Sequence, residues 1–475
     1  MCAMKKQIFF LGIGGIGMSA LARYYLHEGY NVWGYDRTPS ELTHALEKEG
    51  IEIIYGDDRL EIGDWKTKIC AEDTMVVRTP AVPENNSIYT YLREQGFTIL
   101  KRAEALGRIT ATKKALCVAG THGKTTTSTM LAHILSVSGE RLAVSGGNGV
   151  NAFLGGISEN YGTNLLLDKN SAYVVVEADE FDRSFHHLRP YMTVVTSVDP
   201  DHLDIYGTPE AYRESFEKYC SLVSDTILLK YGLCLSCTAR TYHTDSNRAR
   251  VLTYSAEDTR AEYYAANIVV KDGTIVYDLH HPGGVIRDIT LGVPVWVNIE
   301  NSVAAAAIAL LNGVTEDDIR HALATFKGVH RRFNIHVQTP ELAYIDDYAH
   351  HPQEIAASIA SVRKLYPERK LLGIFQPHLY TRTRDFAEGF AKVLSTLDEV
   401  ILLPIYPARE LPIEGVDSEM LLRKISCPRK SLLSKDELVQ TIAARAKALQ
   451  PVAVLTIGAG DIDRLVPAVA ERLKR

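Results

Sequence analysis

Apolar and polar residues alternate along the first part of the chain in the pattern of a βαβ unit. An apolar run at residues 7–11 predicts a buried strand, a glycine-rich turn follows, and residues 18–28 repeat apolar positions at helical spacing. A second apolar run at 31–35 closes on Asp36. This order of strand, glycine turn, helix and strand is typical of nucleotide-binding units. The alternation continues to about Thr110.

A second alternation begins after a polar joint at residues 111–114. Between residues 252 and 291 its apolar runs become short, and the turn pairs Asp272-Gly273 and Gly283-Gly284 predict antiparallel hairpins attached to the same domain. The remaining elements expected here are strands at 115–119, 173–176 and 192–198, a helix after Lys124, and helices at 302–311 and 316–325.

A third alternation follows residues 326–333, with strands expected near 343–345, 371–375, 400–403 and 452–457. A length of 475 residues also suits three domains of roughly 150 residues each. The sequence therefore predicts an α/β protein of three domains. They are a Rossmann-like domain at 1–112, a central P-loop ATPase-type domain at 113–328 whose parallel sheet carries added antiparallel hairpins, and a Rossmann-like domain at 329–475.

Composition narrows the expected partners and compartment. The 52 basic and 58 acidic residues give a net charge of −6 without a long run of one sign, which argues against a nucleic-acid partner. No apolar run reaches the ~18 residues of a membrane span, and residues 1–10 lack the features of a signal peptide. The seven scattered cysteines are then expected to be reduced thiols. We expect a cytoplasmic protein with no membrane partner.

The stretch AGTHGKTTT at residues 119–127 follows an expected strand and precedes an expected helix, so its amides would point at a phosphate. A full Walker pattern needs glycine where this chain has Val118, but Gly120 and Gly123 still permit a tight turn. The alternative is a surface turn. We favour an ATP loop in which Lys124 meets the β and γ phosphates. Its members are Gly120, Thr121, His122, Gly123, Lys124, Thr125 and Thr126.

Two later strands end in acidic and histidine-containing clusters, EADEFD at 177–182 and DPDHLD at 199–204. Since the carboxyl ends of parallel strands meet at one edge of a sheet, Glu177 and His202 are expected to converge on an ion beside the Thr125 hydroxyl. This ligand set suits Mg²⁺, with Mn²⁺ possible. Strand-end acids are often solvated turn residues instead, and we keep that interpretation for Glu180 and Asp204.

The N-terminal glycine loop matches GxGxxG at Gly12, Gly14 and Gly17, and Asp36 stands where a ribose-binding acid is expected. The pattern is a weak signal for a particular chemistry and a fair one for a ligand that carries a diphosphate. NAD and a uridine diphosphate sugar are both candidates.

The third region gathers polar residues after its expected strands: Arg331 and Arg332, then DDYAHH at 346–351 and QPHLYTRTR at 376–384. Arginine and histidine at strand ends can hold a carboxylate and screen a transferred phosphoryl group. A single such residue is more often a surface ion-pair partner, but several after successive strands indicate a site. Together with the two nucleotide loops, they favour ATP-driven ligation, because a carboxylate is a poor acyl donor until it is phosphorylated.

In order along the chain, these motifs resemble those of the Mur ligases of cell-wall synthesis. LGIGGIGMSALA resembles the uridine-nucleotide loop of that family, AGTHGKTTT its ATP loop, and EADEFDRSF and DPDHLDIYG its metal-binding segments. The interdomain and C-terminal motifs are FKGVHRRF, IDDYAHHPQE, FQPHLYTRTRDF, YPARELPIEGV and GAGD. The resemblance covers nearly the whole chain.

The resemblance implies an enzyme that uses ATP and magnesium to join L-alanine to the carboxylate of UDP-N-acetylmuramate through an acyl phosphate, in peptidoglycan precursor synthesis. Lys124, magnesium and the arginines would stabilise the charge of the tetrahedral intermediate. The implied UDP-sugar residues are Gly12, Gly14, Gly15, Ile16, Gly17 and Asp36. The implied residues elsewhere are Asn298, Asn301, Arg332 and Asp347 for ATP, Thr125, Glu177 and His202 for the metal, and Lys124, His202, His350 and Arg382 for catalysis.

The chain departs from the family pattern at three places. Val297 stands where a histidine usually precedes the first adenine-side asparagine, and Leu379 stands where an arginine is common. The segment RTPAVPENN at 78–86 replaces a serine-rich pattern, so we assign no sugar contacts there. With Leu379 in place, Arg382 carries more of the expected substrate binding.

Other functions leave more of the pattern without a role. A nicotinamide oxidoreductase would use the first glycine loop and Asp36 but not Lys124, Thr125 or Glu177. A regulatory GTPase would need an NKxD motif and a DxxG switch after the second strand of the domain, and the sequence has neither at those places. Within the family, a ligase that adds a preformed tripeptide shares the loop architecture, and GIGGIGMSALA favours the branch that adds alanine. Composition fits a monomer and a homodimer equally.

Overall fold

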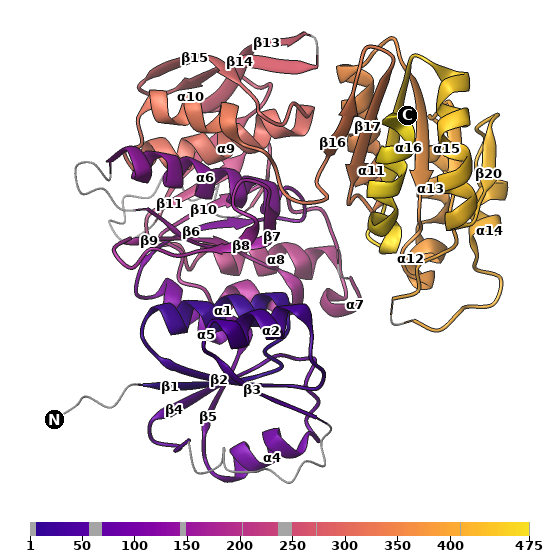
Figure 1. The fold of residues 1–475 in the computed structure, drawn as a ribbon. Coiled ribbons are helices and arrows are strands. Elements are labelled where there is room, and N and C mark those ends of the chain that lie inside the picture. The colour runs from indigo at the N-terminus through magenta and orange to yellow at the C-terminus, as the bar shows by residue number, and fades with distance from the viewer. Residues whose placement is uncertain are drawn as a thin grey trace. The chain divides into compact units, whose positions relative to one another are not determined.

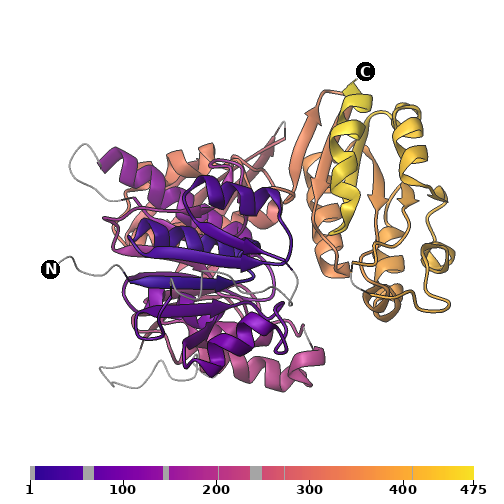
Figure 2. The same ribbon diagram turned by 60° about the horizontal axis from the view of Figure 1, so that its bottom comes forward.

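The structure is a computed structural model that describes residues 6–56, 69–142, 149–201, 203–235, 249–271, 273–408 and 410–474. Within these ranges the strands form sheets of five, ten and six strands (Figures 1 and 2). The contacts divide the chain into two compact units. Unit 1 comprises Met1–Ile157, Tyr161–Tyr264 and Val303–Ala322, and unit 2 comprises Ser158–Asn160, Ala265–Ser302 and Leu323–Arg475. The domain boundaries expected at residues 112 and 328 remain predictions.

The N-terminal sheet is parallel, with the strand order β3-β2-β1-β4-β5. Its central strand β1 (Gln7–Leu11) contributes side chains to two hydrophobic cores, because neighbouring strand residues point to opposite faces. Phe9 packs in the cluster that contains Leu92 of α4, and Phe10 packs in the cluster that contains Leu21 of α1. Figure 1 shows α1, α2 and α5 on one face and α4 on the other. The remaining elements are α1 (Ile16–His27), β2 (Asn31–Asp36), α2 (Glu41–Lys48), β3 (Glu52–Tyr55), β4 (Thr74–Arg78), α4 (Ser87–Glu94), β5 (Thr98–Lys101) and α5 (Arg102–Thr110).

The central sheet is mixed, with the order β15-β14-β13-β12-β11-β10-β6-β9-β7-β8. Its inner strands β11, β10, β6 and β9 pair in parallel, whereas β14 and β15 form an antiparallel pair, as the Gly283-Gly284 turn predicted. Asp272 of the other predicted turn lies outside the described residues. Before the hairpins come β6 (Lys114–Ala119), α6 (Lys124–Leu142), β7 (Asn151–Ser158), β8 (Thr163–Leu166), β9 (Tyr173–Glu177), the 3-10 segment η2 (Phe181–His187), β10 (Met192–Val195), α7 (Leu203–Tyr206), α8 (Pro209–Cys220), β11 (Thr226–Lys230) and β12 (Arg250–Ser255). The rest are β13 (Tyr263–Lys271), β14 (Thr274–His281), β15 (Gly284–Thr290), α9 (Trp296–Leu311) and α10 (Glu316–Thr325).

The C-terminal sheet has the order β16-β17-β21-β18-β19-β20, and all its pairs are parallel except the edge pair of β16 with β17. Helices cover both faces: Ile374 packs with residues of α15 and α16, and the next residue, Phe375, contacts Phe390 of α13. The elements are β16 (Asn334–Gln338), β17 (Leu342–Asp347), α11 (Pro352–Leu365), β18 (Lys370–Phe375), α12 (Tyr380–Asp385), α13 (Ala387–Leu394), β19 (Glu399–Leu402), α14 (Ser418–Lys424), β20 (Lys430–Leu432), α15 (Lys435–Leu449), β21 (Val452–Ile457), η4 (Asp461–Leu465) and α16 (Val466–Lys474).

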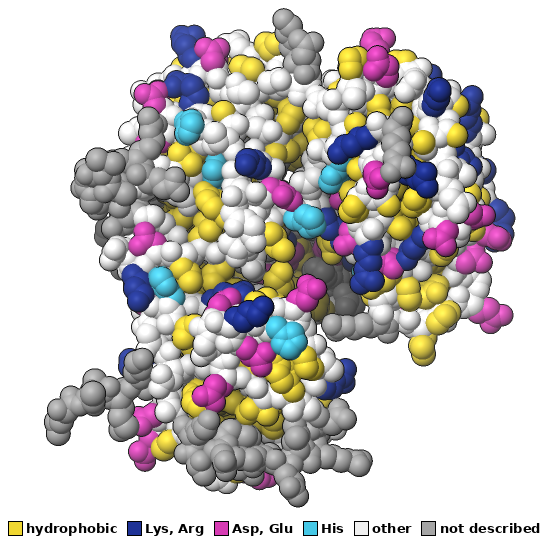
Figure 3. All heavy atoms as spheres, in the orientation of Figure 1, with side chains coloured by type: hydrophobic (Ala, Val, Ile, Leu, Met, Phe, Trp, Pro, Cys, Tyr) yellow, Lys and Arg dark blue, Asp and Glu magenta, His cyan; other side chains and the backbone are white. Residues whose placement is uncertain are grey.

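Surface features agree with the composition. On the face drawn in Figure 3, basic and acidic side chains are interspersed rather than gathered by sign. Among the described residues, none of the helices combines the length and the apolar character that a bilayer crossing requires. The described cysteines, Cys70, Cys117, Cys220, Cys234 and Cys427, carry free thiols.

Candidate active site

The AGTHGKTTT stretch connects β6 to α6, as the sequence predicted. Gly120 has φ +133° and Gly123 has φ +82°, a region in which side chains are strained. A Cβ atom on Gly120 would overlap Thr196 Oγ1 and lie 2.8 Å from Ser197 N. The loop therefore runs against the end of β10 with no room for a side chain at this point.

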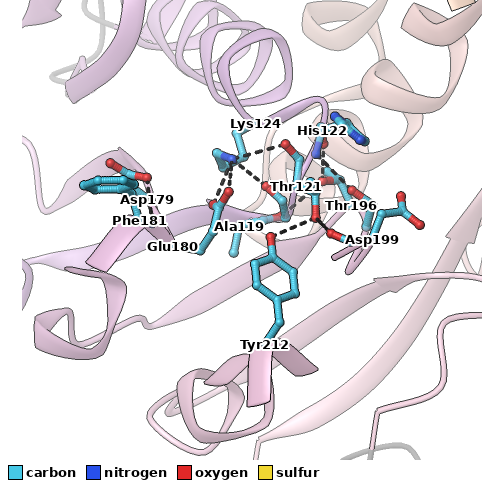
Figure 4. A network of polar contacts seen from close by, with 12 residues as sticks. Ala119, Thr121, His122, Lys124, Asp179, Glu180, Phe181, Thr196, Asp199 and Tyr212 are labelled. Carbon is cyan, nitrogen blue, oxygen red and sulfur yellow. Dashed lines mark hydrogen bonds and ion pairs between the residues drawn. The ribbon is translucent and has the colours of Figure 1, made fainter. Parts of the chain in front are cut away.

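Side chains of neighbouring segments hold the loop in place (Figure 4). The Thr121 hydroxyl donates to Asp199 O at 2.7 Å and lies 2.9 Å from the Tyr212 hydroxyl. The His122 amide donates to Ser197 Oγ at 2.9 Å. Thr121 and His122 are thus tied to the protein, and the loop is preformed.

Lys124, the first residue of α6, points back into the loop. Its ammonium donates to Gly120 O at 2.6 Å and lies 2.9 and 2.8 Å from the two carboxylate oxygens of Glu180. The side chains are 14% and 3% exposed. Burial raises the pKa of Glu180, and the Lys124 ammonium opposes that rise. The expectation that Glu180 is a solvated turn residue is therefore wrong, because it is a buried partner of the predicted phosphate-binding lysine.

Two of the three predicted metal ligands lie at the expected edge of the sheet. Glu177 ends β9, which pairs with β6 so that Glu177 is opposite Val118, just before the loop. Thr125 is in the first turn of α6. His202 lies outside the described residues, as does the side chain of Asp204. Among the residues that are described, no three His, Cys, Asp or Glu side chains form a metal cluster. One carboxylate and one hydroxyl still fit Mg²⁺, which keeps several waters and takes phosphate oxygens as ligands.

The N-terminal glycine loop also has the shape of an anion site. Gly12 has φ +81°, and Gly15 is the N-cap of α1, which no side chain of the described residues caps. The Gly14 amide donates to Asp36 Oδ2 at 2.7 Å, so Asp36 shapes the loop itself. Ile16, whose contact with a UDP sugar was predicted, is 53% exposed.

A cavity in unit 1 extends from this loop to the predicted metal ligand. Its volume is about 100 Å³, and its wall includes Gly17, Arg102, Asn164, Glu177 and Asp179. A Cβ on Gly17 would lie 3.1 Å from Arg102 Nη1, and Arg102 Nη2 lies 3.9 Å from Asp179 Oδ2. Sequence reasoning did not select Arg102. Its position directly after β5 was the signal available for finding it.

In unit 2, His350 and Arg382 both lie near His378. Arg382 Nη1 is 3.4 Å from His378 Nδ1, and the rings of His350 and His378 are 6.4 Å apart. Burial lowers the pKa of His350, and burial together with Arg382 lowers the pKa of His378 to about 4. The structure therefore offers two neutral imidazoles beside one guanidinium at neutral pH.

The turn between His378 and Arg382 has a strained backbone and is held by hydrogen bonds. Leu379 has φ +69°, a conformation that a branched side chain rarely adopts. Its amide donates to Tyr406 O at 3.0 Å, and the Thr381 amide donates to Glu410 Oε2 at 3.0 Å. Tyr406 and Glu410 thus hold the turn that presents Arg382.

The predicted ATP residues of unit 2 mainly bond to the protein. Asp347 is buried and accepts from the Phe333 amide at 3.2 Å and from the Ser358 hydroxyl, and Arg332 lies over the ring of Tyr348. Asn298 donates to Val293 O at 3.2 Å, and Asn301 donates to Asn298 Oδ1 at 3.1 Å. Val297, the departure from the family pattern, is 42% exposed at the start of α9.

Known protein families match nearly the whole chain. Three family models match: the Mur ligase family catalytic domain at residues 7–114, the Mur ligase middle domain at 118–309 and the Mur ligase glutamate ligase domain at 331–462. The UDP-N-acetylmuramate–L-alanine ligase of Porphyromonas gingivalis is 51% identical over 471 residues, 99% of each chain. That of Parabacteroides distasonis is 54% identical over 469 residues, 98% of this chain and 97% of the relative.

Solved structures agree. The UDP-N-acetylmuramate-alanine ligase of Thermotoga maritima is 27% identical with a TM-score of 0.75, and the alignment covers 99% of both chains. A murein peptide ligase of Psychrobacter arcticus, at 22% identity and a TM-score of 0.63 over 98% of both chains, shares the fold. The predicted three-domain α/β fold is confirmed, with a parallel N-terminal sheet and mixed central and C-terminal sheets.

Proposed function

The chain belongs to the Mur ligase family, and from this membership we propose how its residues carry out the reaction of a UDP-N-acetylmuramate–L-alanine ligase. It joins L-alanine to UDP-N-acetylmuramate in peptidoglycan synthesis, at the expense of ATP. The acyl-phosphate route, the metal and the residue roles below are proposals, as is a cytoplasmic location, where ATP is available.

The observation that carries the proposal is the cavity from Gly17 to Glu177. A UDP sugar with its diphosphate on the first glycine loop would reach through this cavity toward the ATP loop after β6. Arg102, at the Gly17 end, would meet negative charge of the substrate. This arrangement supports attack by the substrate's carboxylate on ATP, because the cavity reaches Glu177, which lies opposite Val118 just before the proposed ATP loop.

In the proposed first step, a carboxylate oxygen of UDP-N-acetylmuramate attacks the γ-phosphorus, and ADP leaves with the electrons of the broken P–O bond. Lys124 and the amides of the loop would hold the phosphates and offset the charge that spreads over the transferred group. Thr125 and Glu177 would hold Mg²⁺, which supplies further positive charge on the phosphates when it is bound. The product is an acyl phosphate.

In the second step, the alanine nitrogen attacks the acyl carbon, and phosphate leaves with the oxygen that came from the carboxylate. Arg382 would hold the alanine carboxylate. The neutral imidazole of His350, with that of His378 beside it, would accept the proton that the amine loses. The lowered pKa values of both histidines support this role, because a protonated ring could accept nothing.

The test is phosphate release from ATP in the presence of UDP-N-acetylmuramate and one acceptor at a time: L-alanine, glycine, L-serine or the cell-wall tripeptide. We expect release that depends on both UDP-N-acetylmuramate and L-alanine and is abolished in Lys124→Ala. Release with the tripeptide alone would contradict the assigned acceptor. No coupled release with any of the four would contradict the ligase reaction itself.

A further inference from the structure

Glu180 is a buried carboxylate for which the proposed mechanism has no use. It follows β9 by three residues and is 2% exposed, and both of its carboxylate oxygens lie within 3 Å of Lys124 Nζ. Figure 4 shows the two side chains pointing at one another beneath the loop. The pair joins the segment after β9 to the first residue of α6, which the proposed function assigns to ATP.

The chain holds Glu180 in place by a strained turn. Asp182 and Arg183 are consecutive residues with φ +50° and +56°, in the left-handed region that non-glycine residues avoid. Tyr206 secures this turn, since its hydroxyl donates to Glu180 O at 2.5 Å and its ring lies 4.6 Å from the Arg183 guanidinium. Strain of this kind persists only where the surroundings enforce it, and it gathers at functional sites.

While this pair is intact, the hydrogen-bond donors of the Lys124 ammonium are already used within the protein. An ammonium has three hydrogen atoms to donate. Gly120 O at 2.6 Å, Thr121 O at 3.4 Å and Glu180 Oε1 at 2.9 Å accept them within the loop. A phosphate oxygen that binds Lys124 must therefore replace at least one of these acceptors.

We propose that Glu180 is a positioning residue for Lys124: its carboxylate holds the ammonium inside the loop of the nucleotide-free chain, and the phosphates of ATP compete with it for that ammonium. The inference rests on the proposed function, since it takes the loop as the ATP site. It explains how the buried Lys124 can stay charged in the nucleotide-free chain: Glu180 balances its charge, whereas an unpaired buried charge would destabilise the fold.

Competition has a consequence that other roles lack. An interaction present only in the nucleotide-free state stabilises that state, so its removal lowers the stability of the free chain and raises the affinity for ATP by the same free energy. A purely structural Glu180 would affect both states alike and leave the ATP affinity unchanged. A Glu180 that aims Lys124 at the phosphates would lower the affinity when it is removed.

The experiment is calorimetric titration of ATP into the full-length chain in EDTA, where no metal contributes and ATP is not consumed. We expect Glu180→Gln to bind ATP at least about tenfold more tightly than the wild type, a change of about 1.4 kcal/mol. Glu180→Asp, which keeps the charge on a shorter side chain, should lie between the two. Without nucleotide, Glu180→Gln should melt at a lower temperature.

Asp182→Asn is the matched control. It removes one negative charge from the same segment at an exposed site, and asparagine tolerates the positive φ. Its ATP affinity should match that of the wild type. An unchanged or weaker affinity in Glu180→Gln overturns the inference, and Glu180→Asp decides in the same way if the glutamine variant does not fold. No ATP binding by the wild type would contradict the ATP site, and the inference with it.

Discussion

The side chains of single residues in the proposed ATP loop form hydrogen bonds with other parts of the protein. The Thr121 hydroxyl bonds to Asp199 and Tyr212, and the Lys124 ammonium bonds to Gly120 and Glu180. Lys124 could be selected from sequence because its motif is local, between a strand and a helix. Its pairing with Glu180 could not be predicted from sequence, because Glu180 is 56 residues away and meets Lys124 only through the fold.

Gly120→Ala should disable the loop. The new Cβ would overlap Thr196 Oγ1, and the alanine would have to adopt φ +133°, so the loop must shift. We expect ATP-dependent phosphate release to fall at least about a hundredfold and the unfolding free energy to fall by about 2 kcal/mol. Gly29→Ala is the control, since Gly29 has φ +88° but open space around it. It should lose about 1 kcal/mol and keep its activity, and equal activity losses in the two variants would contradict the steric argument.

Arg102→Gln tests the cavity. Its guanidinium lies between Gly17 and Asp179 on the cavity wall, so its loss should raise the KM for UDP-N-acetylmuramate about tenfold or more, the size of a lost charge-assisted contact, with the KM for ATP unchanged. Arg108→Gln, on the same helix but away from the cavity wall, should behave as the wild type. Steady-state kinetics with each substrate varied in turn gives both constants. An increase in the KM for ATP alone would show that Arg102 serves the other substrate.

At the level of elements, apolar runs located the inner strands well. The strands expected near 371–375 and 452–457 are β18 and β21, because fully buried parallel strands are continuous in apolar residues. The edge strands β16 (NIHVQ) and β20 (KSL) were missed, since half-exposed strands carry polar residues and no such run. The strained turn at Leu379 was also beyond sequence reasoning, because it depends on contacts with Tyr406 and Glu410.

Glu410→Gln should loosen that turn. Glu410 accepts from the Thr381 amide and hydroxyl, and Thr381 directly precedes Arg382. With the charge removed, we expect the KM for L-alanine to rise about three- to tenfold while the KM for ATP stays constant, since hydrogen bonds to a charged group contribute about 1.5 to 3 kcal/mol. Glu414→Gln, an exposed acid of the same segment, is the control. If the two variants have equal KM values for L-alanine, Glu410 does not position the acceptor site.

At the scale of the whole molecule, three runs of strand–helix alternation were enough to predict three sheets of an α/β protein, because each domain repeats one local pattern. The division of contacts into two units was not predictable, since it assigns Ala265–Ser302 of the central region to the C-terminal unit. Buried charge was equally invisible in the sequence. Asp346, which the motif IDDYAHH presents beside Asp347, is 2% exposed.

Asp346 should make the stability of the molecule depend on pH. Burial raises its pKa to about 7, far above the 3.8 of an exposed aspartate. Between these values the folded chain binds a proton that the unfolded chain has lost, so the unfolding free energy falls as the pH rises from about 4 to 7. The loss is about 4 kcal/mol at most.

Asp346→Asn, which cannot ionise, should remove this contribution. Thermal unfolding at pH 5 and pH 8 measures it: the wild type should lose more stability than Asp346→Asn between the two. Parallel pH profiles for the two proteins would show that Asp346 is ionised in the folded chain throughout.

The most direct measurement of the proposed mechanism follows one oxygen atom. UDP-N-acetylmuramate labelled with ¹⁸O in its carboxylate is incubated with the enzyme, ATP, magnesium and L-alanine, and the released phosphate is analysed by mass spectrometry. Attack of the carboxylate on the γ-phosphorus predicts one ¹⁸O in each phosphate released and the other in the new amide. Unlabelled phosphate, or release of AMP and pyrophosphate, would contradict activation through an acyl phosphate at the Lys124 loop.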